Sequence, residues 1–137
     1  MAEGYTFYAS VEHDNGRLAT VRLQSRGEGM NVTVDLLFAS SGIEPEIAEA
    51  AEAIEIVPGL SLPVATTAHL LVLKLLARND ETRPQDLADL NALIAVATDA
   101  DLAAARIAIR LITERGFNRG RDLDTALESL IKSSSTI

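Results

Sequence analysis

The sequence predicts an α+β fold in which a half made of β-strands precedes a half made of helices. Up to residue 66, apolar and polar residues alternate in short runs separated by turns, a pattern typical of an antiparallel or mixed β-sheet. From residue 67 onward, apolar residues recur at helical spacing. An apolar content of 47% in 137 residues is sufficient for one continuous core. We therefore expect a single domain over residues 1–132, followed by a disordered tail over 133–137.

Three strands are expected first. Residues 6–12 and 17–24 flank a turn at 14–16, which predicts a hairpin because the turn contains Asn-Gly. A third strand is expected over residues 31–38. Side chains alternate between the two faces of a strand, so Asp35 should point away from the apolar face of this strand.

A short helix and a second hairpin are expected next. Residues 47–53 are rich in Ala and Glu and follow Pro45, which is acceptable in the first turn of a helix. The Pro-Gly pair at residues 58–59 separates the runs 54–57 and 60–64, and this arrangement predicts two strands joined by a tight turn.

The second half predicts a bundle of about four helices. Their expected bounds are residues 68–78, 84–96, 101–115 and 122–132. The connections between the first three are short, so successive helices should pack as antiparallel neighbours.

Composition narrows the classes of function. A net charge of −8 disfavours nucleic acid and anionic membranes as partners. The sequence contains no cysteine and therefore no disulfide or thiolate metal site. It also shows neither a signal peptide nor a run of apolar residues long enough to span a membrane. We therefore expect a cytoplasmic protein.

One lysine is the first candidate for chemistry. Lys74 is the only charged residue within an otherwise apolar helical run, so its ammonium group needs an anionic partner. That partner could be a phosphate of a ligand or one of three acids: Asp35, Asp86 and Asp89. A lysine that only snorkels or forms a structural ion pair is the competing interpretation.

The acids and arginines that follow Lys74 have two interpretations. Asp86 and Asp89 lie three positions apart and so share one helix face, where they could hold a cation, orient Lys74, or pair with Arg78 and Arg83. An ion pair is the more common outcome for such a spacing. His13 and His69 form no recognisable metal set, and we expect both to be solvated without a role.

Five stretches together resemble one family of proteins. They are V-D-L-L-F-A-S-S-G-I-E at 34–44, V-P-G-L at 57–60, H-L-L-V-L-K-L-L-A-R at 69–78, R-P-Q-D-L-A-D-L at 83–90 and I-T-E-R-G-F at 112–117. The combination is similar to the AbiEii/AbiGii-toxin-type nucleotidyltransferases of bacteria, which are part of the DNA-polymerase-β-like superfamily. The resemblance covers most of the chain from about residue 16.

The resemblance implies a partial nucleotidyltransferase fold and roles for particular residues. Asp35 matches the third acid of a Mg²⁺ site, and Lys74 matches a lysine proposed to meet the phosphates of a nucleoside triphosphate. Both would then be catalytic. The substrate-binding set implied by the resemblance comprises Lys74, Arg78, Arg83, Asp86 and Asp89.

The sequence departs from the family pattern before Asp35. The family places a Gly-Ser or Gly-Thr turn and an Asp-x-Asp pair upstream of the third acid, and residues 1–34 contain neither. We therefore expect an N-terminally truncated or degenerate member that is inactive alone. The alternatives are an active enzyme completed by another subunit, and a noncatalytic interaction module of antitoxin-like or regulatory type. An exposed edge strand at residues 5–12 would offer a homodimer or a partner protein a template for pairing.

Overall fold

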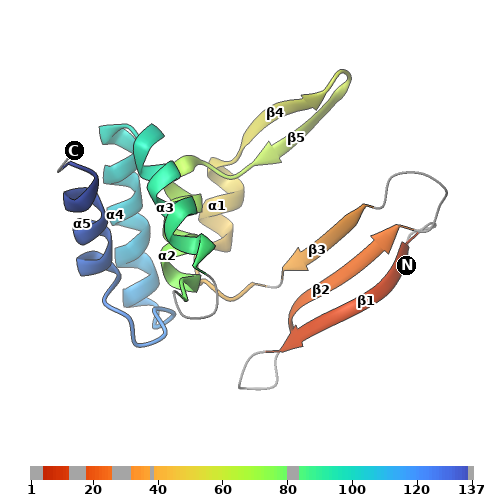
Figure 1. Ribbon diagram of the computed structural model, residues 1–137, viewed down its shortest axis with the longest axis horizontal. Coiled ribbons are helices and arrows are strands. Elements are labelled where there is room, and N and C mark those ends of the chain that lie inside the picture. Colours follow the sequence, from red (N-terminus) through yellow and green to blue (C-terminus); the bar gives the residue numbers. More distant parts are fainter. Residues whose placement is uncertain (1–4, 13–17, 26–31, 38, 80–83, 136–137) are drawn as a thin grey trace. The chain divides into compact units, whose positions relative to one another are not determined.

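The computed structural model contains two small antiparallel sheets followed by a helical bundle, which confirms the α+β prediction (Figure 1). It describes residues 5–12, 18–25, 32–37, 39–79 and 84–135. The chain divides into two compact units, residues 1–40 and 41–137. Each unit is described by itself.

The first unit is a three-stranded antiparallel sheet in the order β1-β2-β3. Its strands are β1 (Tyr5–Glu12), β2 (Leu18–Ser25) and β3 (Thr33–Leu37). The bounds agree with the alternation in the sequence, while the turn predicted at residues 14–16 lies outside the described residues. In the register between β2 and β3, Arg22 lies directly opposite Asp35. Cross-strand neighbours of opposite charge stabilise such a pair of strands.

The second unit begins with one helix and a separate hairpin. The helix α1 (Glu44–Ala50) precedes β4 (Glu52–Val57) and β5 (Leu60–Val64), which form a two-stranded sheet of their own. The predicted helix over 47–53 is therefore placed too far along the chain. Pro45 lies in the first turn, and the backbone becomes extended at Ala51, where the chain enters β4.

Four further helices complete the second unit. They are α2 (Thr67–Ala77), α3 (Gln85–Val96), α4 (Asp99–Glu114) and α5 (Leu123–Ser134). The beginning of α4 comes two residues earlier than predicted, because Thr98 and Asp101 form a reciprocal capping box. None of the described helices is long and apolar enough to cross a membrane.

The end of α5 also differs from the prediction. The helix continues through Ser133 and Ser134, where the sequence suggests the start of a tail. The hydroxyl group of Ser133 donates to the carbonyl of Leu130 and that of Ser134 donates to the carbonyl of Ile131. These hydroxyl groups therefore bond back to carbonyl groups of the preceding turn.

The core of the second unit is built around α2. This helix packs against α3, α4 and α5, and its contacts explain why its sequence is apolar on most sides. Among the residues that the structure describes, fourteen hydrophobic residues of the core are buried, all of them aliphatic: Ile43, Ala68, Leu71, Val72, Leu75, Leu76, Leu90, Ala105, Ala108, Ile109, Ile112, Leu123, Leu127 and Leu130. Leu70 and Lys74, one helical turn apart, form the more exposed side of α2.

Gly42, which precedes α1, lies close to residues at the end of α4. Gly42 has a φ of +79°, which residues with a side chain rarely adopt. A Cβ atom at this position would lie 2.6 Å from Cδ2 of Phe117. Arg115 donates from Nη1 to the carbonyl of Gly42 at 2.6 Å and from Nη2 to Glu46. The backbone at residue 42 is therefore held against the segment that follows α4.

Candidate functional site on helices α2 and α3

The side chains of Lys74 and two aspartates meet between α2 and α3. The Nζ atom of Lys74 donates to Oδ2 of Asp89 at 2.8 Å and lies 3.6 Å from Oδ1 of Asp86. The side chain of Lys74 is 40% exposed, so the lysine is not the buried cation that its sequence context suggests. We call Lys74, Asp86 and Asp89 the Lys74 cluster.

The two aspartates have different surroundings. The side chain of Asp86 is only 5% exposed, and its Oδ2 accepts a hydrogen bond from the backbone N–H of Asn79 at 3.2 Å. Asp89 is 36% exposed and accepts a second hydrogen bond from Nε2 of Gln85 at 3.2 Å. Asp86 therefore connects the end of α2 to α3, whereas Asp89 holds Lys74 at the surface.

Charge pairing shifts the pKa values within the cluster. The hydrogen bond to Asp89 raises the pKa of Lys74, and the charges of Asp89 and Asp86 act in the same direction. The hydrogen bond from Lys74 lowers the pKa of Asp89, with a smaller contribution from Gln85. Lys74 is therefore a permanent cation at neutral pH and does not serve as a general base.

A surface hollow lies beside the ammonium group. It has a volume of about 310 Å³ and is lined by Leu70, Lys74, Asp89, Ala92 and Leu93. An ammonium group has three N–H donors, and the hydrogen bond to Asp89 uses one of them, while Asp86 lies at ion-pair distance. The cluster can therefore present a fixed positive group at the edge of a largely apolar depression.

Arg78 and Arg83 relate differently to this cluster. Arg78 is the C-terminal capping residue of α2 and lies four positions after Lys74, which places the two cations one helical turn apart. Arg83 lies outside the described residues. Of the predicted substrate-binding set, Lys74, Asp86 and Asp89 meet in the Lys74 cluster.

Asp35 belongs to the first unit and has a partner there. Its Oδ1 accepts from Nε of Arg22 at 2.7 Å and its Oδ2 accepts from Nη2 of Arg22 at 2.8 Å. This bidentate pair lowers the pKa of Asp35. Asp35 is half-exposed in this pair, since 35% of its side chain is accessible.

The acids in the described ranges do not converge on a metal site. No group of three or more His, Cys, Asp or Glu side chains there is arranged to hold a metal ion. Both carboxylate oxygens of Asp35 accept from Arg22, and the acids of the Lys74 cluster surround an ammonium group. This donor set does not fit Mg²⁺, which requires several oxygen ligands in octahedral geometry.

His69 is a residue that sequence reasoning misplaces. We expected a solvated side chain, but His69 is only 9% exposed because α2 is enclosed by its neighbours. Desolvation lowers its pKa, against a smaller opposing effect of the charge on Glu46. Its position within an apolar helical run is the signal that could have revealed this burial. His13 lies outside the described residues.

Comparison with known proteins identifies the family. The profile of the family described as nucleotidyl transferase AbiEii toxin, type IV TA system, matches residues 3–135, nearly the whole chain. No curated protein matches the sequence. The family match agrees with the resemblance drawn from the five stretches of sequence. Because it extends over both compact units, the chain belongs to the AbiEii nucleotidyltransferase toxin family.

Proposed function

We propose that this chain binds the phosphates of a nucleoside triphosphate through Lys74 and does not transfer a nucleotide by itself. Membership of the AbiEii family supports a nucleotide as the ligand class. The observation that carries the proposal is the ammonium group of Lys74, fixed by Asp86 and Asp89 beside an open hollow. The cytoplasm, where nucleoside triphosphates are abundant, is the proposed location.

The charges of the cluster support a phosphate that arrives with a counter-cation. One ammonium and two carboxylates give the Lys74 cluster a net charge of −1. The net negative charge of the cluster would repel a triphosphate without Mg²⁺. Binding would then require Lys74 to leave one carboxylate and bind phosphate oxygens in its place. Arg78, one turn away on α2, supplies a further positive charge. We therefore expect binding to be stronger with Mg²⁺-nucleotide than with the free nucleotide.

The acids in the chain support the second half of the proposal. In-line transfer of a nucleotide from a nucleoside triphosphate depends on several carboxylates that position two metal ions. Asp35, the acid that the resemblance assigns to Mg²⁺, is engaged with Arg22, and residues 1–34 contain no Asp-x-Asp pair. Catalysis would therefore require acids that residues 1–34 do not supply, and Asp35 would also have to be released from Arg22.

Thermal unfolding in the presence of nucleotides tests the binding. A ligand that binds only the native state raises the free energy of unfolding by about 2.7 kcal/mol at one hundred times its Kd. We expect ATP, GTP, CTP or UTP with Mg²⁺ to raise the Tm of the wild-type chain. Lys74→Met should abolish the rise, because methionine keeps the length of the apolar stem and removes the charge.

Lys132 provides a matched control. It is the other lysine of the sequence and lies exposed on α5. Lys132→Met should therefore leave the nucleotide-dependent rise in Tm unchanged. No rise with any of the four nucleotides in the wild-type protein would contradict the binding proposal. Transfer of labelled nucleotide to RNA or protein by the purified chain would contradict the proposed inactivity, and Asp35→Ala would then test the acid.

The β4–β5 hairpin favours a second candidate function, as a protein-interaction module. Five large apolar residues of this hairpin are 44–53% exposed: Ile54, Ile56, Val57, Leu60 and Leu62. In the register of the hairpin, Ile54 lies opposite Leu62. Contiguous exposed apolar side chains of this kind are typical of surfaces that bind another protein. In the first unit, β1 is an edge strand and offers a further place for pairing.

Sedimentation velocity separates self-association from a monomeric state. We propose that the hairpin mediates a homodimer, so that the wild-type protein should sediment as a dimer at micromolar concentration and Leu62→Lys as a monomer. Ser61→Lys is the control, because neighbouring residues of a strand face opposite sides. A wild-type monomer at every accessible concentration would contradict the homodimer and leave a different protein, such as an antitoxin, as the partner to seek.

A further inference from the structure

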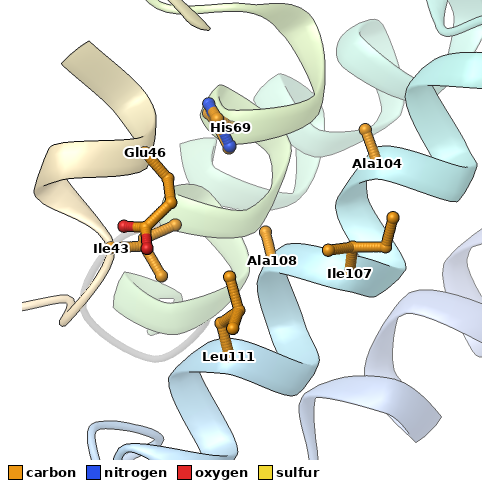
Figure 2. A pocket seen from close by; sticks show the side chains of 7 residues that line it. All are labelled: Ile43, Glu46, His69, Ala104, Ile107, Ala108 and Leu111. Atoms are coloured by element: carbon orange, nitrogen blue, oxygen red, sulfur yellow. The ribbon is translucent and has the colours of Figure 1, made fainter. Parts of the chain in front are cut away.

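A pocket between α1, α2 and α4 lies apart from the Lys74 cluster, and two of the residues that line it each have a buried polar atom without a partner among the described residues. The pocket has a volume of about 150 Å³ and is lined by Ile43, Glu46, His69, Ala104, Ile107, Ala108 and Leu111. Figure 2 shows Glu46 and His69 on the side of α1 and α2, facing the aliphatic side chains of α4. Apart from these two residues, the lining is entirely apolar.

The unpartnered atoms are Oε2 of Glu46 and Nδ1 of His69. Both are buried, and neither has a hydrogen-bond partner among the residues that the structure describes. His69 is more than nine-tenths buried, with 9% of its surface exposed. Buried polar atoms are normally hydrogen-bonded, and both exceptions belong to residues that line one pocket, which points to a group that binds there.

The chemistry of the two atoms specifies that group. The other oxygen of Glu46 accepts from Nη2 of Arg115, and this hydrogen bond lowers the pKa of Glu46, so Oε2 belongs to an ionised carboxylate and can only accept. Burial lowers the pKa of His69, so its ring is neutral and Nδ1 either donates or accepts, depending on the tautomer. A hydroxyl group can donate to the carboxylate and accept from the ring.

The charge of the pocket favours a neutral ligand. Arg115 already compensates the carboxylate of Glu46, and the ring of His69 carries no charge at neutral pH. An anion would face Oε2 of the carboxylate, and a cation would leave its charge largely among aliphatic side chains. A ligand that has one hydroxyl group and an apolar body avoids both costs.

The size of the pocket limits the body of the ligand. A cavity of about 150 Å³ lined by aliphatic side chains is large enough to bind benzene. The pocket has a similar volume, and Ile107, which is 57% exposed, lies at its open side. We propose that this pocket binds a small neutral ligand with one hydroxyl group on a six-membered ring, the hydroxyl lying between Glu46 Oε2 and His69 Nδ1.

Methyl-resonance NMR with phenol and benzene tests the proposal on the wild-type chain. Phenol should give saturable shifts of the Ile43, Ile107 and Leu111 methyl groups, with a Kd at least tenfold lower than that of benzene. No saturable shift with phenol would overturn the proposal. Equal affinity for the two compounds would also overturn it, because the hydroxyl group would then contribute nothing.

A pair of alanine substitutions on α4 locates the binding. Ala104→Leu should fill the pocket and raise the Kd for phenol at least tenfold. Ala103→Leu is the matched control, because Ala103 is exposed on the same helix and does not line the pocket. Phenol binding that survives in Ala104→Leu would overturn the assignment to this pocket. Helical circular dichroism establishes that both variants fold, and the comparison of phenol with benzene needs neither variant.

Discussion

Asp86 and Asp89 contact the same ammonium group, but their contributions to stability should differ. Asp86 is 5% exposed at the side chain and also accepts from the backbone N–H of Asn79. Asp89 is 36% exposed, where water screens the pairing with Lys74. Asp86 therefore mainly stabilises the packing of α2 against α3, whereas Asp89 orients Lys74.

The first prediction compares these two residues. Asp86→Ala should lower the free energy of unfolding by about 1.5–3 kcal/mol, because hydrogen bonds to a buried charged group are lost. Asp89→Ala should cause a clearly smaller loss. Urea unfolding at neutral pH, followed by helical circular dichroism, measures both. Equal losses would show that Asp86 does not connect α2 to α3 in the way described.

A second prediction concerns Gly42. Gly42→Ala should destabilise the protein by about 1–3 kcal/mol more than Gly59→Ala, since the added Cβ would overlap the ring of Phe117. Gly59 is a matched control because its φ of +84° is similar and no atom lies within 4 Å of the position of its Cβ. Thermal unfolding of both variants makes the comparison. Similar losses would exclude a contribution from Phe117.

The third prediction concerns His69 and pH. Burial lowers the pKa of His69 below its ordinary value of 6.5. As the pH falls below that value, the unfolded chain binds a proton that the folded chain refuses, so stability declines until the folded pKa is reached. Carboxylates with a lowered pKa, such as Glu46, lose their stabilising effect mainly below pH 4.5. The two contributions therefore occupy different pH windows.

Replacing His69 by a residue that does not titrate shows over which pH range the histidine affects stability. The loss of stability between about pH 7.5 and about pH 5 should be smaller in His69→Gln than in the wild-type protein. Urea unfolding at the two pH values gives the comparison. An unchanged loss in the variant would mean that His69 is protonated equally in the folded and unfolded chain.

At the scale of the elements, the beginning of α4 depends on one threonine. Thr98 accepts from the N–H of Asp101, whose carboxylate accepts from the N–H and hydroxyl of Thr98 in return. Thr98→Ala should therefore cost about 1 kcal/mol, the usual cost of losing such a cap. Thr98→Ser keeps the hydroxyl group and should cost less. Chemical denaturation of both variants checks the order, and equal stability would contradict it.

Periodicity predicted the helices because it records which side of each helix is buried, and it predicted the strands although no described residue of β3 is buried. Alternation indicated β2 and β3, and helical spacing indicated α2 to α5, to within a few residues at each end. The ends were less predictable, since they depend on side-chain hydrogen bonds. The carboxylate of Asp101, in place of the usual Glu or Gln, completes the box at Thr98, and the serines of α5 bond back to its last turn.

The candidate site was predictable only in part. Spacing placed Asp86 and Asp89 on one face and identified both as possible partners of Lys74, as the structure confirms. The pairing of Asp35 with Arg22 depends on the register of two strands, which a single sequence does not specify. The burial of His69 depends on helices that are distant in sequence. The Asp35–Arg22 pair and the burial of His69 therefore require the three-dimensional structure, because both depend on segments that are separate in the sequence.

At the scale of the whole molecule, the buried core of the described residues lies entirely in the second unit. It extends from Ile43 to Leu130, whereas the first unit ends at residue 40. A single domain over residues 1–132 therefore stays a prediction. The two units differ in composition in a way that permits a direct test, because both tyrosines, Tyr5 and Tyr8, lie in β1 and the sequence has no tryptophan.

The fifth prediction uses this difference. Tyrosine fluorescence reports on the first unit, and circular dichroism at helical wavelengths reports on the second. We expect the fluorescence transition to occur at a lower urea concentration than the helical transition. The second unit contains the buried core and should therefore unfold at a higher urea concentration than the first. Coincident transitions would contradict this order and support one cooperative domain.

The lack of space for a Cβ atom at Gly42 also bears on how members of the family should be compared. A glycine that is required by backbone geometry stays invariant whether or not a protein retains catalysis. Degenerate and active members should therefore share it equally, while residues that serve only the chemistry drift apart. A glycine found at this position in a relative would therefore report on the architecture and would give no information about whether that relative is catalytically active.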